Sequence, residues 1–355
     1  MISIIIPVYN TKKELIERCI NSILRSEFDD FEIIIVNDGS KKECSNYIEK
    51  LKNIDKRIQV FHQKNQGVSA ARNNGIRFSK GDYIAFVDAD DEVNNRYLTQ
   101  ALNYLIENDL DIIIGGLKYK YAKYSKEYRA KFDNHEKLKT YDVNKKMDLL
   151  CHLIEDKATP DIYELENCRH GAVYAKLYRK SILEKISFNE QLFRFEDKIF
   201  NIDAFIKAKR IGVIDDVWYT YYQYSDSSIH KSDLRIIENN CSIMHVIQNK
   251  MQNLKKIKST IYRYYLFLVY DSFRGNLNII YKWKAVEKFN EKMRKWINDD
   301  LWNEVIKEIE VDDLQNYQAK LLKSIGQKSI FLLWLNVIYV AVANLIKGRV
   351  LKLKN

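Results

Sequence analysis

Short, continuously apolar runs alternate with longer segments whose apolar residues recur every three or four positions through roughly the first ninety residues. The apolar runs are rich in β-branched residues and predict buried strands, whereas the longer period predicts amphipathic helices. The predicted strands are 3–8, 31–37, 58–62 and 83–87, and the helices between them begin at residue 11 and cover 41–52 and 67–79. This alternation predicts right-handed βαβ crossovers and a mostly parallel sheet with helices on both faces.

Beyond residue 100 the pattern becomes mixed, and from residue 234 onward it is helical without further strand signals. The elements expected in the mixed region are a strand at 111–115, helices at 144–155 and 198–209, and a strand at 211–222. The change near residues 230–235 predicts a boundary there, with an α/β domain over 1–232 and a helical region over 233–355.

Composition supports a globular protein and leaves the class of partner open. Hydrophobic residues make up 46% of the 355 and charged residues 30%, which is enough apolar material for a core. The net charge of +10 fits a nucleic acid, an anionic membrane or a sugar diphosphate as partner, and it equally fits a solvated basic surface. The cysteines are odd in number and form no CxxC pair, which argues against a disulfide framework or a zinc site and fits a reducing cytoplasm. They are Cys19, Cys44, Cys151, Cys168 and Cys241.

Two carboxylates one residue apart, Asp88 and Asp90, directly follow the predicted strand 83–87. Ligands bind at the carboxyl ends of strands in open α/β sheets, so this position favours a functional role. One acid can bind a ribose hydroxyl and the other a Mg²⁺ or Mn²⁺ ion on a diphosphate, because hard cations prefer oxygen ligands. The alternative is an ordinary solvated turn.

Polar residues also follow the other predicted strands. Asp38 is placed either to accept a hydrogen bond from a nucleobase imide or to cap the helix that follows it. Arg72 lies one turn inside the helix that begins near Gly67. There it either contacts a phosphate or pairs with the carboxylates of Asp88 and Asp90, and the two roles are compatible.

The four segments PVYN, VNDGS, NQGVSAARNNG and FVDADD together resemble the donor-binding half of family 2 inverting glycosyltransferases, which have the GT-A fold. The resemblance implies an α/β, Rossmann-like, mostly parallel sheet flanked by helices and followed by an α-helical C-terminal region. It implies a nucleoside-diphosphate sugar, most often a uridine one, and a divalent cation, Mn²⁺ or Mg²⁺. Residues 1–100 are then the nucleotide-binding half and 101–232 the acceptor-binding half. The donor-binding positions that the resemblance implies are Pro7, Tyr9, Asn10, Asp38, Asn65, Gly67, Arg72, Asp88, Ala89 and Asp90, with Asp90 as a metal ligand.

A weaker resemblance continues at GAVYAKLYRKSIL, residues 171–183, which is similar to the segment preceding the acceptor site in bacterial members of the family. Val173 and Tyr174 stand where a Trp is usual. This departure affects one wall of the expected site.

The segment RFEDKIF, residues 194–200, resembles the ED-x-x-F motif, with Phe195 where a Gly is common. The resemblance implies Asp197 as the general base, next to Glu196. A carboxylate can take the acceptor's hydroxyl proton as that oxygen attacks the anomeric carbon opposite the leaving diphosphate, which inverts the configuration. From the residues alone, the two acids are equally an acid pair at a helix N-terminus.

The segment SDSSIHKS, residues 225–232, resembles the closing loop of the family. His230 is then a further metal ligand or a contact to the diphosphate, and Lys231 is the alternative partner of the leaving phosphates. A surface histidine with neither role fits the residues as well.

The last apolar stretch, 329–346, has basic residues on both flanks, and no acid follows Asp313. Its length of about 18 residues is at the short end for a membrane span. The pattern therefore favours a helix lying in an anionic membrane surface, with a buried terminal helix as the alternative. The N-terminus lacks the basic region of a signal peptide. We expect a cytoplasmic protein at the inner face of the cell membrane with a glycan or lipid-linked acceptor.

Two other functions compete with the glycosyltransferase hypothesis. A nucleotidyltransferase usually has a Gly-rich loop with Arg or Lys after its first strand, and PVYNTKKE is not one. A basic scaffold or nucleic-acid-binding protein leaves the strand-end acids unexplained, because carboxylates repel phosphate. We therefore expect a glycosyltransferase of polysaccharide or cell-wall glycan synthesis with no nucleic-acid partner.

Overall fold

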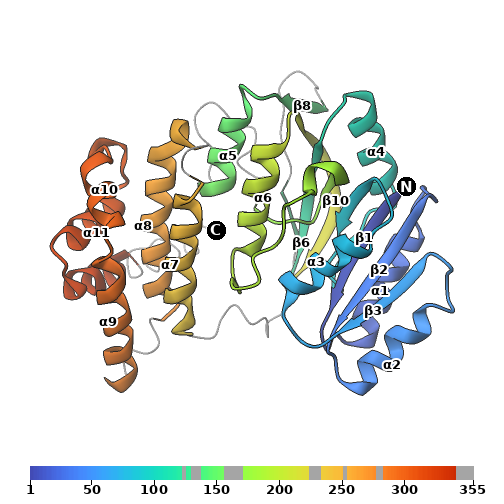
Figure 1. Cartoon of the computed structure of the whole chain (residues 1–355), viewed down its shortest axis with the longest axis horizontal. Coiled ribbons are helices and arrows are strands. Elements are labelled where there is room, and N and C mark those ends of the chain that lie inside the picture. Colours follow the sequence, from blue (N-terminus) through green and yellow to red (C-terminus); the bar gives the residue numbers. More distant parts are fainter. Residues whose placement is uncertain are drawn as a thin grey trace, which may run out of the picture. The chain divides into compact units, whose positions relative to one another are not determined.

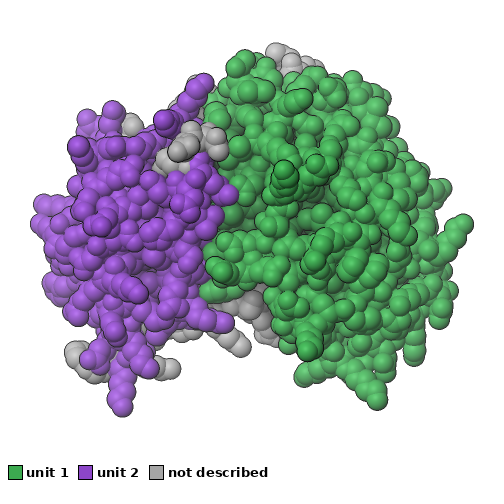
Figure 2. Space-filling model, in the orientation of Figure 1, with its two compact units in different colours: residues 1–225 green, residues 226–355 purple. Residues whose placement is uncertain are grey.

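The computed structural model describes residues 1–121, 125–128, 137–155, 171–223, 233–250, 254–276 and 283–340. The chain forms two compact units, Met1–Ser225 and Asp226–Asn355, drawn in green and purple in Figure 2. The first unit combines strands with helices, and the secondary structure of the described part of the second is helical.

A ten-stranded sheet is the centre of the first unit within the described residues (Figure 1). Its strand order is β3-β2-β1-β4-β9-β6-β10-β5, with β7 paired to β6 and β8 paired to β10. The strands are β1 Ile2–Val8, β2 Phe31–Asp38, β3 Ile58–Gln63, β4 Tyr83–Phe86, β5 Glu92–Val93, β6 Ile112–Lys120, β7 Ser125–Tyr128, β8 Leu138–Tyr141, β9 Lys176–Arg179 and β10 Ile211–Tyr222. The α-helices are α1 Lys13–Leu24, α2 Lys42–Leu51, α3 Val68–Phe78, α4 Tyr97–Glu107, α5 Lys146–Glu155 and α6 Glu196–Lys207.

The first four strands follow the parallel arrangement expected from the sequence. β1 pairs in parallel with β2 and β4, and β2 pairs in parallel with β3. β2 is buried along its whole length and β1 nearly so, because both faces of this part of the sheet are covered. The α/β fold class with a flanked central sheet is thereby confirmed.

The second half of the sheet contains antiparallel pairings that the sequence pattern did not indicate. β9 lies antiparallel between β4 and β6, while β10 runs parallel to β6. The sequence also gave no prediction of α4. β9 has only four residues, too few for a periodic signal, and its place depends on partners far away in the sequence.

Close packing of α3 against the sheet brings its first turns to the edge where β1 and β4 end. A Cβ atom on Gly75 would lie only 2.3 Å from Cγ2 of Ile5, so a larger residue would push the helix away. Arg72, one turn earlier, is buried at this junction.

The second unit packs its helices around an apolar interior that includes Ile243, Leu266 and Phe289. Its α-helices are α7 Arg235–Gln248, α8 Lys258–Arg274, α9 Trp283–Ile297, α10 Leu301–Glu308 and α11 Asn316–Gly326. Residues 330–340 are also helical. The rest of the predicted membrane-associating helix, 341–346, lies outside the described residues. Among the helices that the structure describes, none is long and apolar enough to cross a membrane.

Candidate active site

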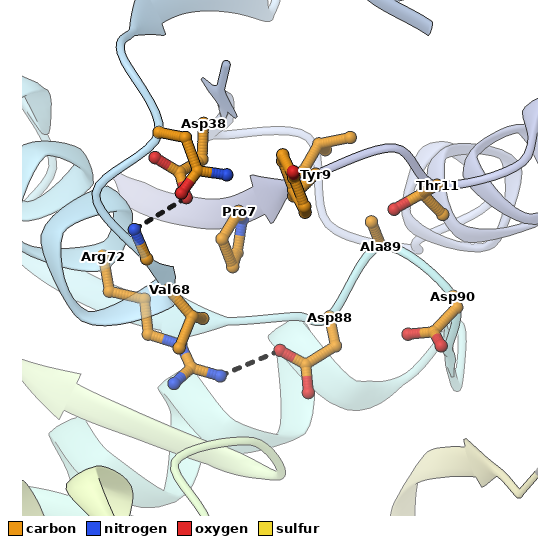
Figure 3. Close-up of a pocket in the computed structure, with 12 residues that line it drawn as sticks. Pro7, Tyr9, Thr11, Asp38, Val68, Arg72, Asp88, Ala89 and Asp90 are labelled. Atoms are coloured by element: carbon orange, nitrogen blue, oxygen red, sulfur yellow. Dashed lines mark hydrogen bonds and ion pairs between the residues drawn. The ribbon is translucent and has the colours of Figure 1, made fainter. Parts of the chain in front are cut away.

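A cavity of about 510 Å³ opens where β1, β2 and β4 end and α3 begins. Nine of the ten residues expected to bind the donor line this cavity, and Figure 3 shows them arranged around one space. Val8, Thr11 and Val68, which were not among the expected residues, complete the lining. The lining residues are Pro7, Val8, Tyr9, Thr11, Asp38, Asn65, Gly67, Val68, Arg72, Asp88, Ala89 and Asp90.

Asn10, the tenth expected residue, lies beside the cavity and connects two of its loops. It lines a neighbouring cavity of about 330 Å³. Its side-chain oxygen accepts a hydrogen bond from the N–H of Lys41 at 2.7 Å, and its own N–H donates to Oγ of Ser40 at 2.9 Å. Asn10 adopts φ 51°, a left-handed conformation that Asn tolerates better than most residues. It therefore holds the β1–α1 and β2–α2 loops together.

Asp38 is buried, and its carboxylate organises the loop that precedes α3. Its oxygens accept hydrogen bonds from the N–H groups of Gln66 at 2.8 Å and Gly67 at 2.9 Å, and from Nε2 of Gln63 at 2.7 Å. The helix-capping alternative is wrong, because α2 starts after Lys41 and has no side-chain cap. Asp38 thus fixes the backbone of the loop while it lines the cavity (Figure 3).

Arg72 joins the donor cavity to the acids at the start of α6. Its Nη2 lies 3.0 Å from Oδ1 of Asp88, and its Nη1 lies 2.6 Å from Oδ1 of Asp197 and 3.5 Å from Oε1 of Glu196. Burial opposes the positive charge, but the facing carboxylates outweigh it and raise the pKa of the guanidinium. Arg72 therefore remains a fixed cation shared by three acids, and the expected pairing with Asp88 is one part of this arrangement.

Asp197 lies in the first turn of α6, and its side chain is 20% exposed. Burial raises the pKa of its carboxyl to about 7, and the charges of Glu196 and Asp88 act in the same direction. Arg72 and a hydrogen bond from the N–H of Val173 oppose this rise. A carboxyl with a pKa near neutrality can accept a proton at pH 7 and release it again, which suits a general base.

Phe195, the residue that replaces a common Gly, has φ 61° and immediately precedes α6. This left-handed conformation carries a steric cost for any residue with a Cβ atom. The backbone turn that it makes places the two acids of the first turn, Glu196 and Asp197, toward Arg72.

The loop after β4 contains a third acid, Asp91, whose position is structural. Asp91 is fully buried, and its carboxylate accepts hydrogen bonds from the hydroxyl of Tyr219 at 2.7 Å and the N–H of Tyr222 at 2.9 Å. Burial first and then the charge of Asp88 raise the pKa of this carboxyl to about 8. Asp91 fastens the loop to β10, a role that the sequence alone did not separate from those of its acidic neighbours.

Asp90 is the acid of this loop with the features of a cation ligand. Burial first and then the neighbouring Asp88 raise the pKa of its carboxyl. Its backbone oxygen accepts a hydrogen bond from Arg18, which holds the residue in place. Two carboxylates at the mouth of one cavity repel each other, so a Mg²⁺ or Mn²⁺ ion fits this donor set. The other expected metal ligand, His230, lies outside the described residues.

A group of tyrosines borders the acidic loop. The ring of Tyr174 stacks on that of Tyr219 with centroids 4.5 Å apart, and it also lies 5.9 Å from Tyr221. Tyr119 packs 5.0 Å from Tyr221 on the other side. An aromatic wall therefore exists here without the usual Trp, built from β6, β10 and the segment before β9.

Comparisons with known proteins agree with these features. The family model for glycosyl transferase family 2 matches residues 3–187. The uncharacterized glycosyltransferase EpsJ of Bacillus subtilis (strain 168) is 34% identical over 230 residues, which are 64% of this chain and 62% of EpsJ. EpsH of the same organism is 28% identical over 301 residues, 82% of this chain and 81% of EpsH. Residues 1–349 of S. aureus TarS, solved in complex with UDP-GlcNAc, give a TM-score of 0.69 at 20% identity and cover 96% of this chain and 92% of that one. At that identity the likeness shows the GT-A fold.

Proposed function

The chain belongs to glycosyl transferase family 2 and is a glycosyltransferase, and from this premise we propose that it transfers a sugar from a nucleoside-diphosphate sugar to a hydroxyl group with inversion. The acceptor that we propose is a glycan or a lipid-linked oligosaccharide. The observation that carries the proposal is the position of Arg72, which joins a donor-cavity acid, Asp88, to a partly buried base, Asp197. Family membership argues against the nucleotidyltransferase and scaffold alternatives.

The nucleoside end of the donor fits the part of the cavity between Pro7, Tyr9 and Asp38. Tyr9 is 54% exposed and offers a flat aromatic face to a base. Asp38 retains acceptor capacity beside the amide hydrogen bonds that it already receives, and a uracil imide N–H is a matching donor. S. aureus TarS was solved in complex with UDP-GlcNAc. We propose a uridine donor for this chain.

The diphosphate and its cation fit the acidic end of the cavity. We propose that Asp90 binds Mn²⁺ or Mg²⁺, with Asp88 on the ribose side. Such an ion would neutralise charge on the leaving diphosphate. Asp90 contributes an oxygen ligand, and Arg18 keeps the loop in place through the backbone oxygen of Asp90.

Asp197 is the proposed general base. Its carboxylate takes the proton of the acceptor hydroxyl while the new bond from that oxygen to the anomeric carbon forms. The bond from the anomeric carbon to the diphosphate breaks with its electron pair on the leaving oxygen, so a single displacement inverts the carbon. Arg72 and Glu196 position this carboxylate and set its charge.

We propose that the tyrosine group formed by Tyr119, Tyr174, Tyr219 and Tyr221 provides the wall against which sugar rings pack. Tyr174 and Tyr221 are partly exposed, whereas Tyr119 and Tyr219 are buried behind them. Aromatic faces bind the apolar C–H surfaces of sugars while hydroxyl groups bind their edges.

Membrane contact is the proposed reason for the apolar character of the last described helix. Phe331, Leu335, Ile338 and Tyr339 are 70%, 47%, 37% and 62% exposed. Their spacing of four, three and one residues puts them on one helical face. This exposed face of four large apolar side chains is costly in water and stable in a membrane interface.

Basic residues precede the same helix in the chain, and one of them contacts its apolar face. Lys320, Lys323 and Lys328 are exposed, and Nζ of Lys320 lies 4.6 Å from the ring centroid of Tyr339. Lysines beside an apolar face favour an anionic lipid surface. A lipid-linked acceptor would be presented at such a surface, and we propose that the enzyme acts at the inner face of the cell membrane.

Vesicle flotation tests the membrane proposal. Full-length protein should float with vesicles that contain anionic lipid and less with purely zwitterionic vesicles. The double variant Phe331→Ser, Leu335→Ser should lose flotation, whereas Ile106→Ser, which alters a 57% exposed residue of α4, should keep it. Equal flotation of all three proteins, or no flotation of the wild type, would rule the proposal out.

Calorimetry of nucleotide binding tests the donor site. UDP and UDP-sugars should bind with Mn²⁺, and the metal-dependent part should disappear in Asp90→Asn. The matched control is Asp82→Asn. Asp82 directly precedes β4, at the opposite end of that strand from Asp90, and its side chain is 83% exposed. Nucleotide binding that changes neither with Mn²⁺ nor in Asp90→Asn would refute the proposed role of Asp90 as a metal ligand. Absence of nucleotide binding with every metal tested would refute the donor site itself. The anomeric configuration of the product, measured by NMR, tests inversion.

A further inference from the structure

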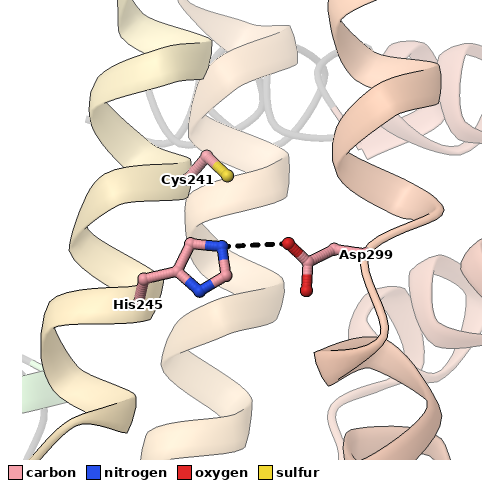
Figure 4. Close-up of side chains that lie close together, drawn as sticks. All are labelled: Cys241, His245 and Asp299. Carbon is pink, nitrogen blue, oxygen red and sulfur yellow. Dashed lines mark ion pairs between the residues drawn. The ribbon is translucent and has the colours of Figure 1, made fainter.

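Three residues with metal-binding side chains meet in the second unit. Cys241 and His245 lie on α7, and Asp299 lies between α9 and α10 (Figure 4). One ligand atom from each lies within 4.8 Å of the other two. Nε2 of His245 is 2.9 Å from Oδ2 of Asp299.

The fold explains why these side chains converge. Cys241 and His245 are four residues apart on one helix, so both project from the same face. Asp299 accepts a hydrogen bond at Oδ1 from the N–H of Leu301 at 3.0 Å. This bond fixes the carboxylate at the start of α10 and leaves Oδ2 directed toward His245. The local backbone thus orients the carboxylate before any ion binds, as second-shell hydrogen bonds do in metal sites.

We propose that Cys241, His245 and Asp299 bind one zinc ion, with water as the fourth ligand, and that the ion ties α7 to the connection between α9 and α10. Thiolate, imidazole and carboxylate all serve as ligands of Zn²⁺, which takes four ligands in a tetrahedron. Zinc–ligand bonds of about 2.0–2.3 Å place ligand atoms roughly 3.5 Å apart. The ligand atoms lie within 4.8 Å of one another, so only a short movement brings them to this spacing.

The ligand set distinguishes zinc from the cations proposed for the donor cavity. Mg²⁺ and Mn²⁺ prefer oxygen ligands, whereas a thiolate and an imidazole favour zinc. Burial first and then the charge of Asp299 raise the pKa of the Cys241 thiol to about 11, while Lys295 lowers it. The thiol is therefore protonated without a cation, and a bound zinc ion supplies the positive charge that lets it ionise.

Cysteine spacing in the sequence argued against a zinc site, because no two cysteines form a CxxC pair. A site with only one cysteine leaves no such pattern. Here Cys241 and His245 share one helix, and the third ligand, Asp299, follows more than fifty residues later. Only the packing of the α9–α10 connection against α7 brings the set together.

Cobalt substitution in the full-length protein tests the proposal. Protein stripped of metal should bind one equivalent of Co²⁺ with a sulfur-to-cobalt charge-transfer absorption and the intense visible bands of tetrahedral cobalt. Zn²⁺ should abolish both. A carboxylate site such as Asp90 gives no sulfur band, so this readout does not depend on the donor site.

Two variants and their controls make the result decisive. Cys241→Ser should lose the sulfur band, and His245→Ala should lower Co²⁺ affinity at least tenfold. Cys44→Ser, which alters a half-buried free thiol of the first unit, should keep the band, and so should His62→Ala, which removes a surface His–Glu pair with Glu49. Circular dichroism confirms that each variant folds. Absence of the sulfur band in the wild type, or its persistence in Cys241→Ser, would overturn the zinc site.

Discussion

Replacement of Arg72 by Met should change the pH at which the enzyme becomes active. Arg72 places its Nη1 2.6 Å from Asp197 and its Nη2 3.0 Å from Asp88. A positive charge at this distance favours the ionised carboxylate, so Arg72 holds the pKa of Asp197 down against burial. Without it, burial and the charges of Glu196 and Asp88 are opposed only by the hydrogen bond from Val173. The pKa of Asp197 therefore rises in the variant.

The size of the change follows from the charge that is lost. An opposite charge within about 4–6 Å lowers a carboxyl pKa by about 1–3 units. The pKa of Asp197 is about 7 with Arg72 present. A base works only when ionised, so kcat/KM of the wild type should rise with pH through about 7. In Arg72→Met this rise should move up by about 1–3 pH units, which lowers kcat/KM at pH 7 by about 5–500-fold through ionisation alone.

The assay is the pH profile of kcat/KM for the wild type, Arg72→Met and Arg72→Lys. Lysine keeps a positive charge without the bidentate geometry of arginine. The rise of kcat/KM in Arg72→Lys should therefore occur at a pH between those of the wild type and Arg72→Met. Removing one partner of a buried ion pair costs about 3–5 kcal/mol of stability, so thermal unfolding must first show that the variants are folded at the assay temperature. A rise at the same pH in Arg72→Met and wild type, or at lower pH in the variant, would refute the reasoning.

Two further predictions concern the start of α6. Asp197→Asn should bind UDP with an affinity within about twofold of the wild type but lose transfer by at least about 100-fold, because only the proton acceptor is removed. Calorimetry measures the binding of UDP, and product formation measures the transfer. Near-normal turnover would remove Asp197 as the base. Phe195→Gly should be more stable than Phe195→Ala by about 1 kcal/mol, because both lose the ring and only Gly adopts φ 61° without strain. Denaturant unfolding compares the two, and equal stability would mean that the backbone there is unstrained.

The sequence predicted the first half of the sheet well because its signals are local. β1 and β2 are continuous buried runs, and the motifs stand directly at the ends of strands. The predicted strand 211–222 coincides with β10. β9 carried no comparable signal, since four residues that pair in antiparallel fashion with distant strands have no periodicity to detect.

The candidate site shows the same limit at the level of side chains. Arg72 and Asp197 are 125 residues apart, and no pattern in either segment indicates that they form an ion pair. Asp91 looks like its acidic neighbours in the sequence, yet burial against Tyr219 gives it a structural role. Residue type and strand position thus indicate which residues surround a cavity, whereas charge sharing depends on contacts that only the fold creates.

One guanidinium shared between Asp88 and the two acids of α6 makes the ionisation of the base depend on whether the donor is bound. A donor whose ribose or cation takes up the charge of Asp88 leaves more of the field of Arg72 acting on Asp197. The pKa of Asp197 then falls from about 7, and a larger fraction of the base is ionised at neutral pH once the donor has bound. The pH dependence of kcat reports the donor-bound enzyme, whereas that of kcat/KM reports the free enzyme. We therefore expect kcat to rise at lower pH than kcat/KM. Rises at the same pH would show that Asp88 and Asp197 are not linked. The position of Arg72 therefore couples binding of the donor to ionisation of the base.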